Sequence, residues 1–503
     1  MNDESVLGID IGTSATKAVL AAPDGRVLAQ VERQHTLSLP RPGWVEHDAE
    51  QVWWQDVLAV LAELVPLAHG GLRGICVSGI GPCVVPCDTK LRPLRPAILY
   101  GIDTRAGAEV EELNGRYGAD SILARGGSRL SSQSLGPKLL WLRKNEPELW
   151  RATAAWYMAS SFVVARLSGE HVLDHHSASQ CSPLYDLDSG KWAEDWAGEV
   201  APGPPLPRLV WPAEPVGLVS PSAAVETGLP AGLPVMAGTI DAWAEAFSVG
   251  VRAPGDLMLM YGSTMFFVGV VGTDTRSHLH WFTEGVEPGR RTLAAGMATS
   301  GSLTDWLRTL LGKPPWPELL AAAEAVPAGS HGLLVLPYLA GERSPIYDPD
   351  ARGVIAGLTL SHGAAELLRA SYEGIAFGIR QVLTSFDVAG ASPTRLVAVG
   401  GGTRARLWLQ IVSDITVRAQ DVPEQTLGAS YGDALLAAIG SGIVTADTDW
   451  TVTAETIEPS ALDATTYEEL FSLYCDLYPA TRSTAHHLAQ LQRRSATAGQ
   501  PAA

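Results

Sequence analysis

The sequence predicts an α/β protein whose two halves share one architecture. Residues 5–31 predict a meander of antiparallel strands, because three β-prone runs are joined by short turns. Residues 255–271 repeat the pattern of an apolar run, a small hydroxyl turn and a second apolar run. Both openings lead into alternating helical and buried-strand patterns, which are typical of α/β layers. We therefore predict a weak internal duplication with a boundary just before Pro254.

The first half contains a clear order of elements. Pro23-Asp24-Gly25 separates the second strand from the third, since Asp-Gly pairs favour tight hairpins. Residues 48–68 place apolar side chains at helical spacing, with Asp48 as the expected N-cap. Two apolar runs at 74–81 and 83–88 predict further strands. Residues 200–234 are so rich in Pro and Gly that we expect an irregular connection there.

The second half follows the same scheme. After its opening hairpin, residues 302–312 predict a helix and residues 395–402 a strand that ends in three glycines. Beyond residue 487 the periodicity is lost, and we expect the chain to fray. The predicted domains are therefore 1–250, 251–488 and a disordered tail at 489–503.

Composition excludes several classes of protein. The chain of 503 residues has 36 Lys and Arg against 54 Asp and Glu, a net charge of -18 with no basic block. Nucleic acid is therefore not an expected partner. No apolar run is long enough to span a membrane, and the first residues are acidic where a signal peptide would be basic. We expect a cytoplasmic protein with no membrane partner.

The cysteines and one histidine pair are candidate metal ligands by residue type. The five cysteines form no CxxC pair, so we expect packed, reduced thiols rather than disulfides or a zinc site. His175 and His176 lie near Asp174, but we expect an exposed polar loop there.

The turn after the first strand carries the first chemical signal. Asp10 lies beside Gly12-Thr13-Ser14, whose amides and hydroxyls can hold a phosphate, while the carboxylate can hold a hydrated divalent cation. The same turn also occurs in ordinary hairpins. Lys17 lies on the second strand, where it either contacts a phosphate or faces solvent.

The motifs that follow resemble, in their order, the FGGY family of carbohydrate kinases, which belongs to the superfamily of actin and hexokinase. The second family signature, GVIAGLTLSHGAAELLRASYEG at 353–374, is satisfied throughout. The first, GPKLLWLRKNEPELW at 136–150, departs from its pattern only at Leu135 just before it. The other similar motifs are GIDIGTS at 8–14, RPGWVEHD at 41–48, VAVGGGTRARLWLQIVSDI at 397–415 and TLGASYGDALLAAIG at 426–440.

The resemblance implies a fold and a reaction. The fold is α/β, with two actin-like (ribonuclease H-like) ATPase domains flanking an interdomain cleft. The cofactors are ATP and Mg²⁺, with Asp10 organising the metal. Asp241 is the expected catalytic base, although a plain N-cap role is the alternative for an aspartate at this position. A helix N-terminus there would keep its carboxylate ionised.

The resemblance also implies binding residues. The nucleotide contacts are Gly12, Thr13, Ser14, Lys17, Gly262, Ser263, Thr264, Gly301, Ser302, Gly400, Gly401, Gly402 and Ala405. The substrate contacts are Gly81, Pro82, Asp103, Asp241, Ala242 and Trp243.

The sequence leaves open which sugar or polyol accepts the phosphate. Xylulose kinases usually carry a Met-His pair where this chain has Gly81 and Pro82. A ketopentose such as xylulose is expected, with another ketose or polyol (ribulose, erythritol or glycerol) as the alternative. Glycerol is less favoured, because the Arg-Glu pair of glycerol kinases is absent. A non-catalytic actin-like ATP-binding scaffold also stays open, as does a homodimer.

Overall fold

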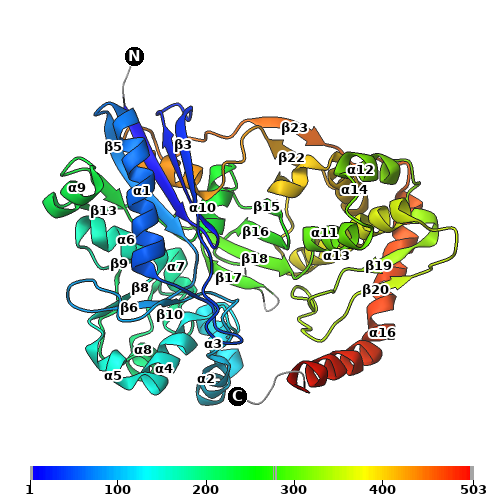
Figure 1. Ribbon diagram of the computed structural model, residues 1–503, viewed down its shortest axis with the longest axis horizontal. Coiled ribbons are helices and arrows are strands. Elements are labelled where there is room, and N and C mark those ends of the chain that lie inside the picture. The colour runs from blue at the N-terminus through cyan, green and yellow to red at the C-terminus, as the bar shows by residue number, and fades with distance from the viewer. Residues whose placement is uncertain (1–3, 276, 278–279, 499–503) are drawn as a thin grey trace. The chain divides into compact units, whose positions relative to one another are not determined.

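The computed structural model describes residues 4–275, 277 and 280–498. The chain divides into two compact α/β units, each drawn in Figure 1. The first unit comprises Met1–Arg252, Gly272–Thr292 and Leu427–Thr451. The second comprises Ala253–Val271, Leu293–Thr426 and Val452–Ala503. The first unit is thus assembled from three separate stretches of chain.

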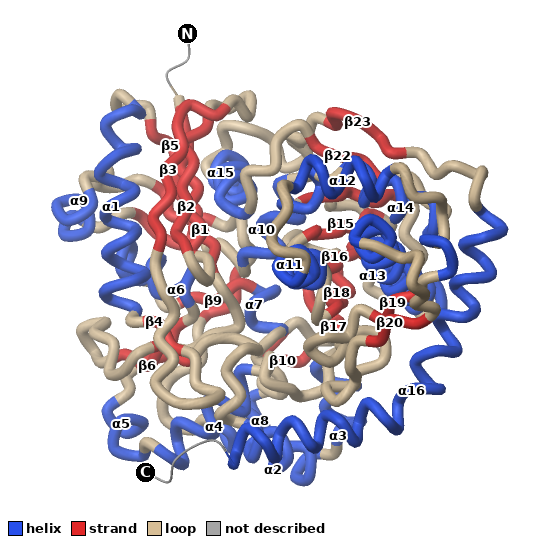
Figure 2. Tube along the Cα trace, turned by 45° about the vertical axis from the view of Figure 1, so that its right-hand side comes forward, coloured by secondary structure: helices blue, strands red, loops and turns tan. Residues whose placement is uncertain are grey.

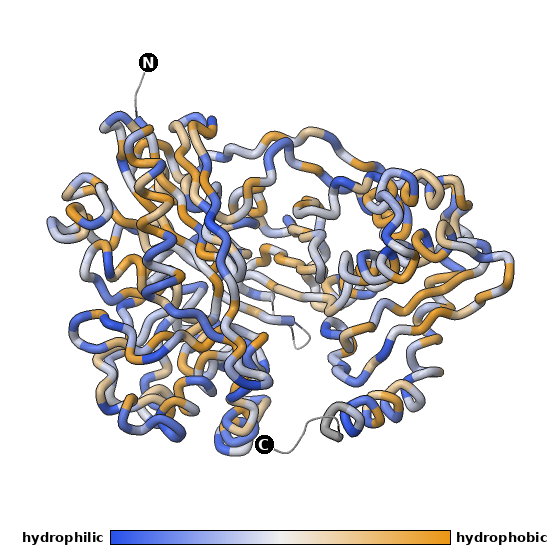
Figure 3. Tube along the Cα trace, in the orientation of Figure 1, coloured by the Kyte–Doolittle hydropathy of each residue, from blue (hydrophilic) through white to orange (hydrophobic). Residues whose placement is uncertain are grey.

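A six-stranded sheet forms the centre of the first unit, in the order β13-β14-β5-β1-β2-β3. β1, β2 and β3 are the predicted antiparallel meander, and β5 pairs parallel with β1. The edge strand β3 is largely exposed, whereas β1 and β5 are buried. Figure 3 shows the hydropathy of the residues along these strands. The bounds are β1 (Ser5–Ile11), β2 (Ala15–Ala21), β3 (Val27–Gln34), β5 (Leu72–Gly79), β13 (Pro215–Leu218) and β14 (Pro234–Met236).

The helix predicted at 48–68 is confirmed, with irregular ends. A π-helical turn at Ala49–Trp54 leads into α1 (Gln55–Leu64), and a 3₁₀ turn at Val65–Ala68 closes it. Asp48 is the N-cap, as predicted: its carboxylate accepts hydrogen bonds from the backbone amides of Glu50 and Gln51, each at 3.0 Å.

Two further helices bring the functional residues of the first unit together. α10 (Asp241–Ser248) follows β14, and α15 (Ala429–Gly440) comes from the last stretch of the unit. α15 packs against β1, β5 and α10. Glycines make this possible: a Cβ at Gly8 would lie 2.0 Å from the carbonyl oxygen of Ser430, and one at Gly432 would lie 2.0 Å from that of Ala244.

The rest of the first unit consists of shorter elements. Its other helices are α2 (Gly107–Tyr117), α3 (Ala119–Gly126), α4 (Leu135–Asn145), α5 (Pro147–Ala152), α6 (Ala159–Ser168), α7 (His175–Ser179), α8 (Glu194–Val200) and α9 (Pro221–Thr227). Its short strands are β4 (Glu46–His47), β6 (Val85–Cys87), β7 (Ala97–Ile98), β8 (Ala155–Tyr157), β9 (Val172–Asp174), β10 (Tyr185–Asp186), β11 (Lys191–Trp192) and β12 (Arg208–Val210).

The second predicted hairpin, at residues 255–271, is confirmed as β15 and β16. β15 also pairs parallel with β21, which confirms the predicted strand at 395–399. They belong to a seven-stranded sheet in the order β17-β18-β16-β15-β21-β22-β23. Its strands are β15 (Asp256–Tyr261), β16 (Met265–Val271), β17 (Trp281–Glu284), β18 (Arg291–Met297), β21 (Arg395–Val399), β22 (Gln420–Pro423) and β23 (Thr453–Ile457).

Helices accompany this sheet, as Figure 2 shows for α11, α12, α13 and α14. α11 confirms the helix predicted at 302–312, and none of the described helices is both long and apolar enough to cross a lipid bilayer. The bounds are α11 (Gly301–Leu310), α12 (Trp316–Glu324), α13 (Ala364–Val388), α14 (Arg406–Thr416), α16 (Ala464–Ala498), β19 (Leu334–Leu336) and β20 (Val354–Ala356).

Two expectations about irregular chain are corrected. Residues 200–234 hold β12, β13, α9 and the start of β14. Pro221 begins α9 after Ser220, whose hydroxyl accepts from the amide of Ala223, and a proline is tolerated in the first turn of a helix.

The expected fraying beyond residue 487 is also corrected, because α16 continues to Ala498. Ala489 is fully buried and Arg493 pairs with Asp350, which anchors this end of the helix. Residues 499–503 of the predicted tail lie outside the described residues.

The cysteines are free thiols, as predicted. Cys76, Cys83, Cys87 and Cys181 are buried and Cys475 is partly buried. Burial raises the pKa of Cys83 and of Cys87 to about 12, so both stay protonated at neutral pH.

Candidate active site

The turn between β1 and β2 is tightly held. The amide of Gly12 donates to the carbonyl oxygen of Ala15 at 2.9 Å, and the hydroxyls of Thr13 and Tyr100 share a hydrogen bond of 3.0 Å. His35 contacts the carbonyl oxygen of Gly12 through Nε2 at 3.1 Å. Ser14 at the tip is exposed. Hydrogen bonds therefore fix the turn at Gly12 and Thr13, whereas Ser14 faces solvent.

Asp10 and Lys17 face each other across the same hairpin. They are register partners on β1 and β2, so their side chains lie on one face of the sheet. Asp10 Oδ1 is buried and accepts no hydrogen bond from the described residues. Lys17 is exposed. One carboxylate oxygen of Asp10 thus has no partner in the part of the chain that the structure describes.

Three more carboxylates gather around Asp10: Asp241 and Glu245 of α10, and Asp433 of α15. Burial, together with repulsion from these three acids, raises the pKa of Asp10 well above its usual range. Burial also raises the pKa of Asp241 to about 6 and, with repulsion from Asp241, that of Glu245 to about 7. The sequence pointed to Asp10 and Asp241 but not to the other two.

Asp433 differs from the neighbouring acids because other protein groups donate hydrogen bonds to its carboxylate. Its carboxylate accepts hydrogen bonds from the amide of Ser78 at 3.2 Å, the hydroxyl of Ser78 at 2.6 Å and the thiol of Cys76 at 3.7 Å. Burial raises its pKa as well. Asp433 therefore joins α15 to β5 beneath the cluster.

Asp241 is the first residue of α10, whereas Ile240 occupies the N-cap position. Asp241 Oδ1 accepts from the amide of Ala242 at 2.7 Å. This hydrogen bond lowers the pKa of Asp241, but the loss of hydration outweighs it. Asp241 therefore lies at a helix N-terminus, as expected, and with a pKa of about 6 its carboxylate is ionised at neutral pH.

The loop after β5 lies beside this helix start. The amide of Gly79 donates to the carbonyl oxygen of Thr239 at 3.2 Å. A Cβ at Gly81 would lie 2.6 Å from Cγ1 of Ile240, so the segment with Gly81 and Pro82 packs directly before Asp241. The structure thus brings these three predicted substrate residues together.

Trp243 and His176 form a buried wall on the other side of α10. Trp243 Nε1 donates to the hydroxyl of Thr292 at 2.8 Å, and its ring centroid lies 4.0 Å from that of His176. The His176 ring also forms hydrogen bonds with the carbonyl oxygen of Glu284 and with the side-chain nitrogen Nε2 of Gln180, and burial lowers its pKa to about 3. Ala242 is partly exposed.

The prediction of an exposed loop at His175 and His176 is therefore wrong. Asp174 begins α7 by accepting from the amide of Ser177 at 3.1 Å, and this short helix turns His176 into the interior. The side chain of His176 is fully buried.

Asp103 is held in a buried ion pair. Its carboxylate accepts from Arg105, with 2.6 Å to Nη2, and from the amide of Val45 at 2.7 Å. The guanidinium of Arg105 in turn lies 4.0 Å from the ring centroid of Trp44. Both Asp103 oxygens are thus engaged by the protein.

In the second unit, two predicted phosphate segments meet. Within residues 262–264, Gly262 donates to the carbonyl oxygen of Thr264 at 3.1 Å. Ser300 and Ser302 donate their amides to the carbonyl oxygen of Ser263 at 3.0 and 3.1 Å. The amide of Gly301 donates to the carbonyl oxygen of Gly262 at 3.0 Å, and the hydroxyl of Ser302 donates to the carbonyl oxygen of Ser263 at 2.7 Å. The start of α11 is therefore clamped against the hairpin turn.

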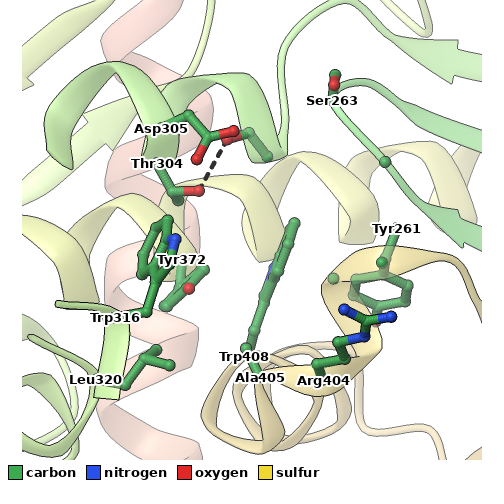
Figure 4. Close-up of a pocket in the computed structure, with 14 residues that line it drawn as sticks. Tyr261, Ser263, Thr304, Asp305, Trp316, Leu320, Tyr372, Arg404, Ala405 and Trp408 are labelled. Atoms are coloured by element: carbon green, nitrogen blue, oxygen red, sulfur yellow. Dashed lines mark hydrogen bonds between the residues drawn. The ribbon is translucent and has the colours of Figure 1, made fainter. Parts of the chain in front are cut away.

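A cavity of about 600 Å³ opens beside this clamp, shown in Figure 4. Its aromatic lining was not predicted: Tyr372 and Trp408 stack with centroids 5.0 Å apart, and Tyr261 and Trp316 complete the wall. The other lining residues are Gly262, Ser263, Gly301, Thr304, Asp305, Leu320, Gly401, Gly402, Arg404 and Ala405.

The glycine run gives the cavity its shape. Gly400 has a φ of 92°, which favours glycine, and a Cβ at Gly402 would lie 2.6 Å from the Trp408 ring. Gly400 itself does not line the cavity, whereas Gly401, Gly402 and Ala405 do. Trp408 could have been predicted to line the cavity, because it follows the glycine run within the same motif at 397–415. Trp316 belongs to none of the motifs, so the sequence offered no reason to place it there.

Comparison with known proteins identifies the family. Residues 5–248 match the model of the FGGY family of carbohydrate kinases, N-terminal domain, and residues 257–441 match that of the C-terminal domain. The chain belongs to the FGGY family of carbohydrate kinases. It is therefore a carbohydrate kinase, with ATP as a substrate.

Several FGGY kinases are similar over most of their length. A xylulose kinase of Bacillus subtilis is 30% identical over 488 residues, 95% of this chain and 97% of the relative. A xylulose kinase of Escherichia coli is 32% identical over 443 residues, which cover 86% of this chain and 88% of the relative. The solved structure of xylulose kinase from Rhodospirillum rubrum has a TM-score of 0.89 at 35% identity, covering 96% of this chain and 100% of that one.

A kinase with another acceptor is similar as well. A glycerol kinase of Nocardia farcinica is 31% identical over 479 residues, 88% of this chain and 92% of the relative.

Proposed function

We propose that this kinase transfers the γ-phosphate of ATP to a hydroxyl of a ketopentose, with xylulose as the first candidate. The observation that carries the proposal is Asp241, a fixed carboxylate at the start of α10 that lies directly after the Gly81–Pro82 contact. The xylulose kinases that are 30–35% identical to this chain over most of its length support the choice of acceptor.

Asp241 acts as the general base in this proposal. With a pKa of about 6, its carboxylate is ionised at neutral pH and still basic enough to take a proton from a hydroxyl that attacks phosphorus. The amide of Ala242 holds Oδ1, which orients the carboxylate and leaves Oδ2 for the acceptor hydroxyl.

The residues around Asp10 fit a divalent cation. Asp10 Oδ1 is buried without a hydrogen bond from the described residues, and three other acids surround it. Among residues 4–275, 277 and 280–498, no three His, Cys, Asp or Glu side chains form a direct ligand cage. Mg²⁺ is commonly held by one or two carboxylates, water and phosphate oxygens, so Asp10 suits it. Bound there, Mg²⁺ would neutralise the charge of the phosphates.

The second unit holds the nucleotide in this proposal. The aromatic cavity lined by Trp316, Tyr372 and Trp408 suits the flat base, since bases stack on aromatic rings. The amides of Gly262, Gly301 and Ser302 are already bonded to carbonyl oxygens. The exposed residues Ser263 and Thr264 of the turn at 262–264 therefore offer their hydroxyls to the phosphates.

A second acceptor class has its own support. Gly81 and Pro82 supply no side-chain donor for a sugar hydroxyl, and the similar glycerol kinase uses the same family scaffold. Another ketose or a polyol, such as ribulose, erythritol or glycerol, is therefore the alternative acceptor.

The test is a coupled assay of ADP release with xylulose, ribulose, erythritol and glycerol, run with the wild type and Asp241→Asn. We expect the highest kcat/KM with xylulose and almost no stimulation in the variant. A higher kcat/KM with a polyol would replace xylulose by that acceptor. ATP hydrolysis that no acceptor stimulates would contradict the proposal as a whole.

A further inference from the structure

We propose that the first unit binds a small inorganic oxyanion, such as phosphate or sulfate, in a cavity where the ammonium group of Lys138 holds it. The cavity has a volume of about 100 Å³ and lies where the start of α2 meets the start of α4. The nucleotide cavity belongs to the second unit, so the two sites are different. Lys138 lies in the motif at 136–150, to which the proposed function assigns no role.

Two stretches of chain form the wall of this cavity. Residues 103–110 run into α2, and residues 131–138 run into α4, which packs against α2. The volume is several times the space that one water molecule needs, so the cavity has room for a small ion.

Lys138 is a buried cation with hydrogens left to donate. Only 1% of the residue is exposed. An ammonium group has three hydrogens, and among the described residues its one hydrogen-bond acceptor is the carbonyl oxygen of Ser132. Asp103 attracts Lys138 but forms no ion pair with it within 4.0 Å. Because a buried charge is unfavourable unless acceptors surround it, the remaining hydrogens need an acceptor inside the cavity that Lys138 lines.

Other groups on the wall are donors as well. The hydroxyl oxygen of Ser131 accepts from the amide of Gln133 at 3.1 Å, and that of Ser134 accepts from the amide of Ser131 at 3.2 Å. Each hydroxyl therefore keeps its own hydrogen, which it donates to no other group in the described part of the chain. Gly107, the first residue of α2, adds the partly positive start of a helix. This surplus of donors favours an anion as the ligand.

Asp103 is the acid among the residues that line the cavity, and its charge is compensated. Its Oδ2 lies 2.6 Å from Nη2 of Arg105, whose side chain is buried with it, and also accepts from the amide of Val45. Since Asp103 and Arg105 pair with each other, the charge left at the cavity is that of Lys138.

Calorimetric titration of inorganic phosphate into the full-length protein tests the site. The protein is first saturated with a non-hydrolysable ATP analogue, which fills the phosphate positions of the nucleotide site. The wild type is compared with Lys138→Met, with the charge-retaining Lys138→Arg and with Lys90→Met, which replaces an exposed lysine of the same unit. Ala106→Leu keeps Lys138 but places a larger side chain on the cavity wall, so it tests the site even if Lys138→Met does not fold.

We expect Lys138→Met and Ala106→Leu each to weaken phosphate binding at least about tenfold, Lys138→Arg to keep part of it, and Lys90→Met to match the wild type. A wild type that binds no phosphate would mean that the cavity holds only water, and would overturn the proposal. Equal phosphate affinity in the wild type and Ala106→Leu would place the ion elsewhere, with the same result.

The affinity for sulfate should also fall at alkaline pH. Burial lowers the pKa of Lys138 to about 8, so its ammonium group is charged below that pH and neutral above it. Asp103 and Arg105 stay paired beside it, and burial raises the pKa of the nearby Cys83 to about 12, so this thiol stays neutral. Sulfate keeps its charge from about pH 6.5 to about pH 9.5, and a constant affinity over this range would contradict the role of Lys138.

Discussion

Asp241 carries the pH dependence at the scale of single residues. Burial raises the pKa of its carboxyl to about 6, so the base is protonated below that pH and ionised above it. We therefore expect kcat/KM for the sugar to rise about tenfold per pH unit on the acid side and to level off above about pH 6. Initial rates of ADP release from about pH 5 to about pH 8 measure this profile.

Replacing Asp241 by Asn removes the base but keeps the shape of the side chain. Turnover should fall about 10²-fold or more, while the affinity for ADP is largely kept, since the nucleotide cavity lies in the other unit. The remaining activity should show no acid limb near pH 6. Wild-type turnover in Asp241→Asn would mean that another group takes the proton.

Trp316 offers a separate test of the nucleotide cavity. Removing its ring by Trp316→Ala takes away one aromatic wall of the cavity. ADP binding should weaken by about 5- to 150-fold, because stacking of a base on an aromatic ring is worth about 1–3 kcal/mol. Trp316→Phe should bind nearly as well as the wild type. Trp306, an exposed ring on α11 that does not line the cavity, provides the control Trp306→Ala. Calorimetric titration with ADP distinguishes these variants.

Single residues were predictable where their chemistry is local. Asp10, Asp241 and the glycine turns follow short patterns, and the structure holds Asp10 and Asp241 close enough to repel each other. Glu245 and Asp433 join them only through tertiary packing, which brings residues from the two ends of the chain together. The roles of the predicted site residues in binding and catalysis stay predictions.

At the scale of elements, the contact between α10 and α15 depends on Gly432. A Cβ there would lie 2.0 Å from the carbonyl oxygen of Ala244, and a backbone atom cannot rotate away. We expect Gly432→Ala to lower the free energy of unfolding by about 1–3 kcal/mol, because the helices must move apart. Urea unfolding measures the change.

A second glycine provides the matched control. Gly115 lies within α2, and a Cβ there would meet nothing within 4 Å. Gly115→Ala should leave the protein as stable or slightly more stable, since alanine is the better helix former. Equal effects of the two substitutions would mean that the close contact at Gly432 does not limit stability.

Elements with a regular period were predictable, and irregular ones were not. The two hairpins, the capped helix after Asp48 and the strand before the glycine run all appear as expected. α9 was not predicted, because proline and glycine usually interrupt helices. Here Pro221 is the first residue of the helix and Gly228 caps its C-terminal end. The continuation of α16 was missed because its anchors, such as Asp350, are distant in sequence.

At the scale of the whole molecule, the two units should respond to different ligands. ADP should protect backbone amides of the second unit from hydrogen exchange, chiefly at 261–264, 300–305 and 400–408, which surround the cavity. Xylulose should instead protect α10 and the segment from Gly79 to Pro82 in the first unit. Protection by ADP confined to the first unit would contradict the assignment of the nucleotide cavity.

The route of the chain through the first unit has a consequence for synthesis. β1 and β5 leave the ribosome before α15, which covers them and begins only at residue 429. A nascent chain must therefore carry an uncovered apolar strand surface until α15 has been made, which exposes it to aggregation and to chaperones. For the same reason, a gene fragment that ends at Arg252 would encode the six-stranded sheet without α15, which covers it, although Arg252 is the last residue of the unit's first stretch.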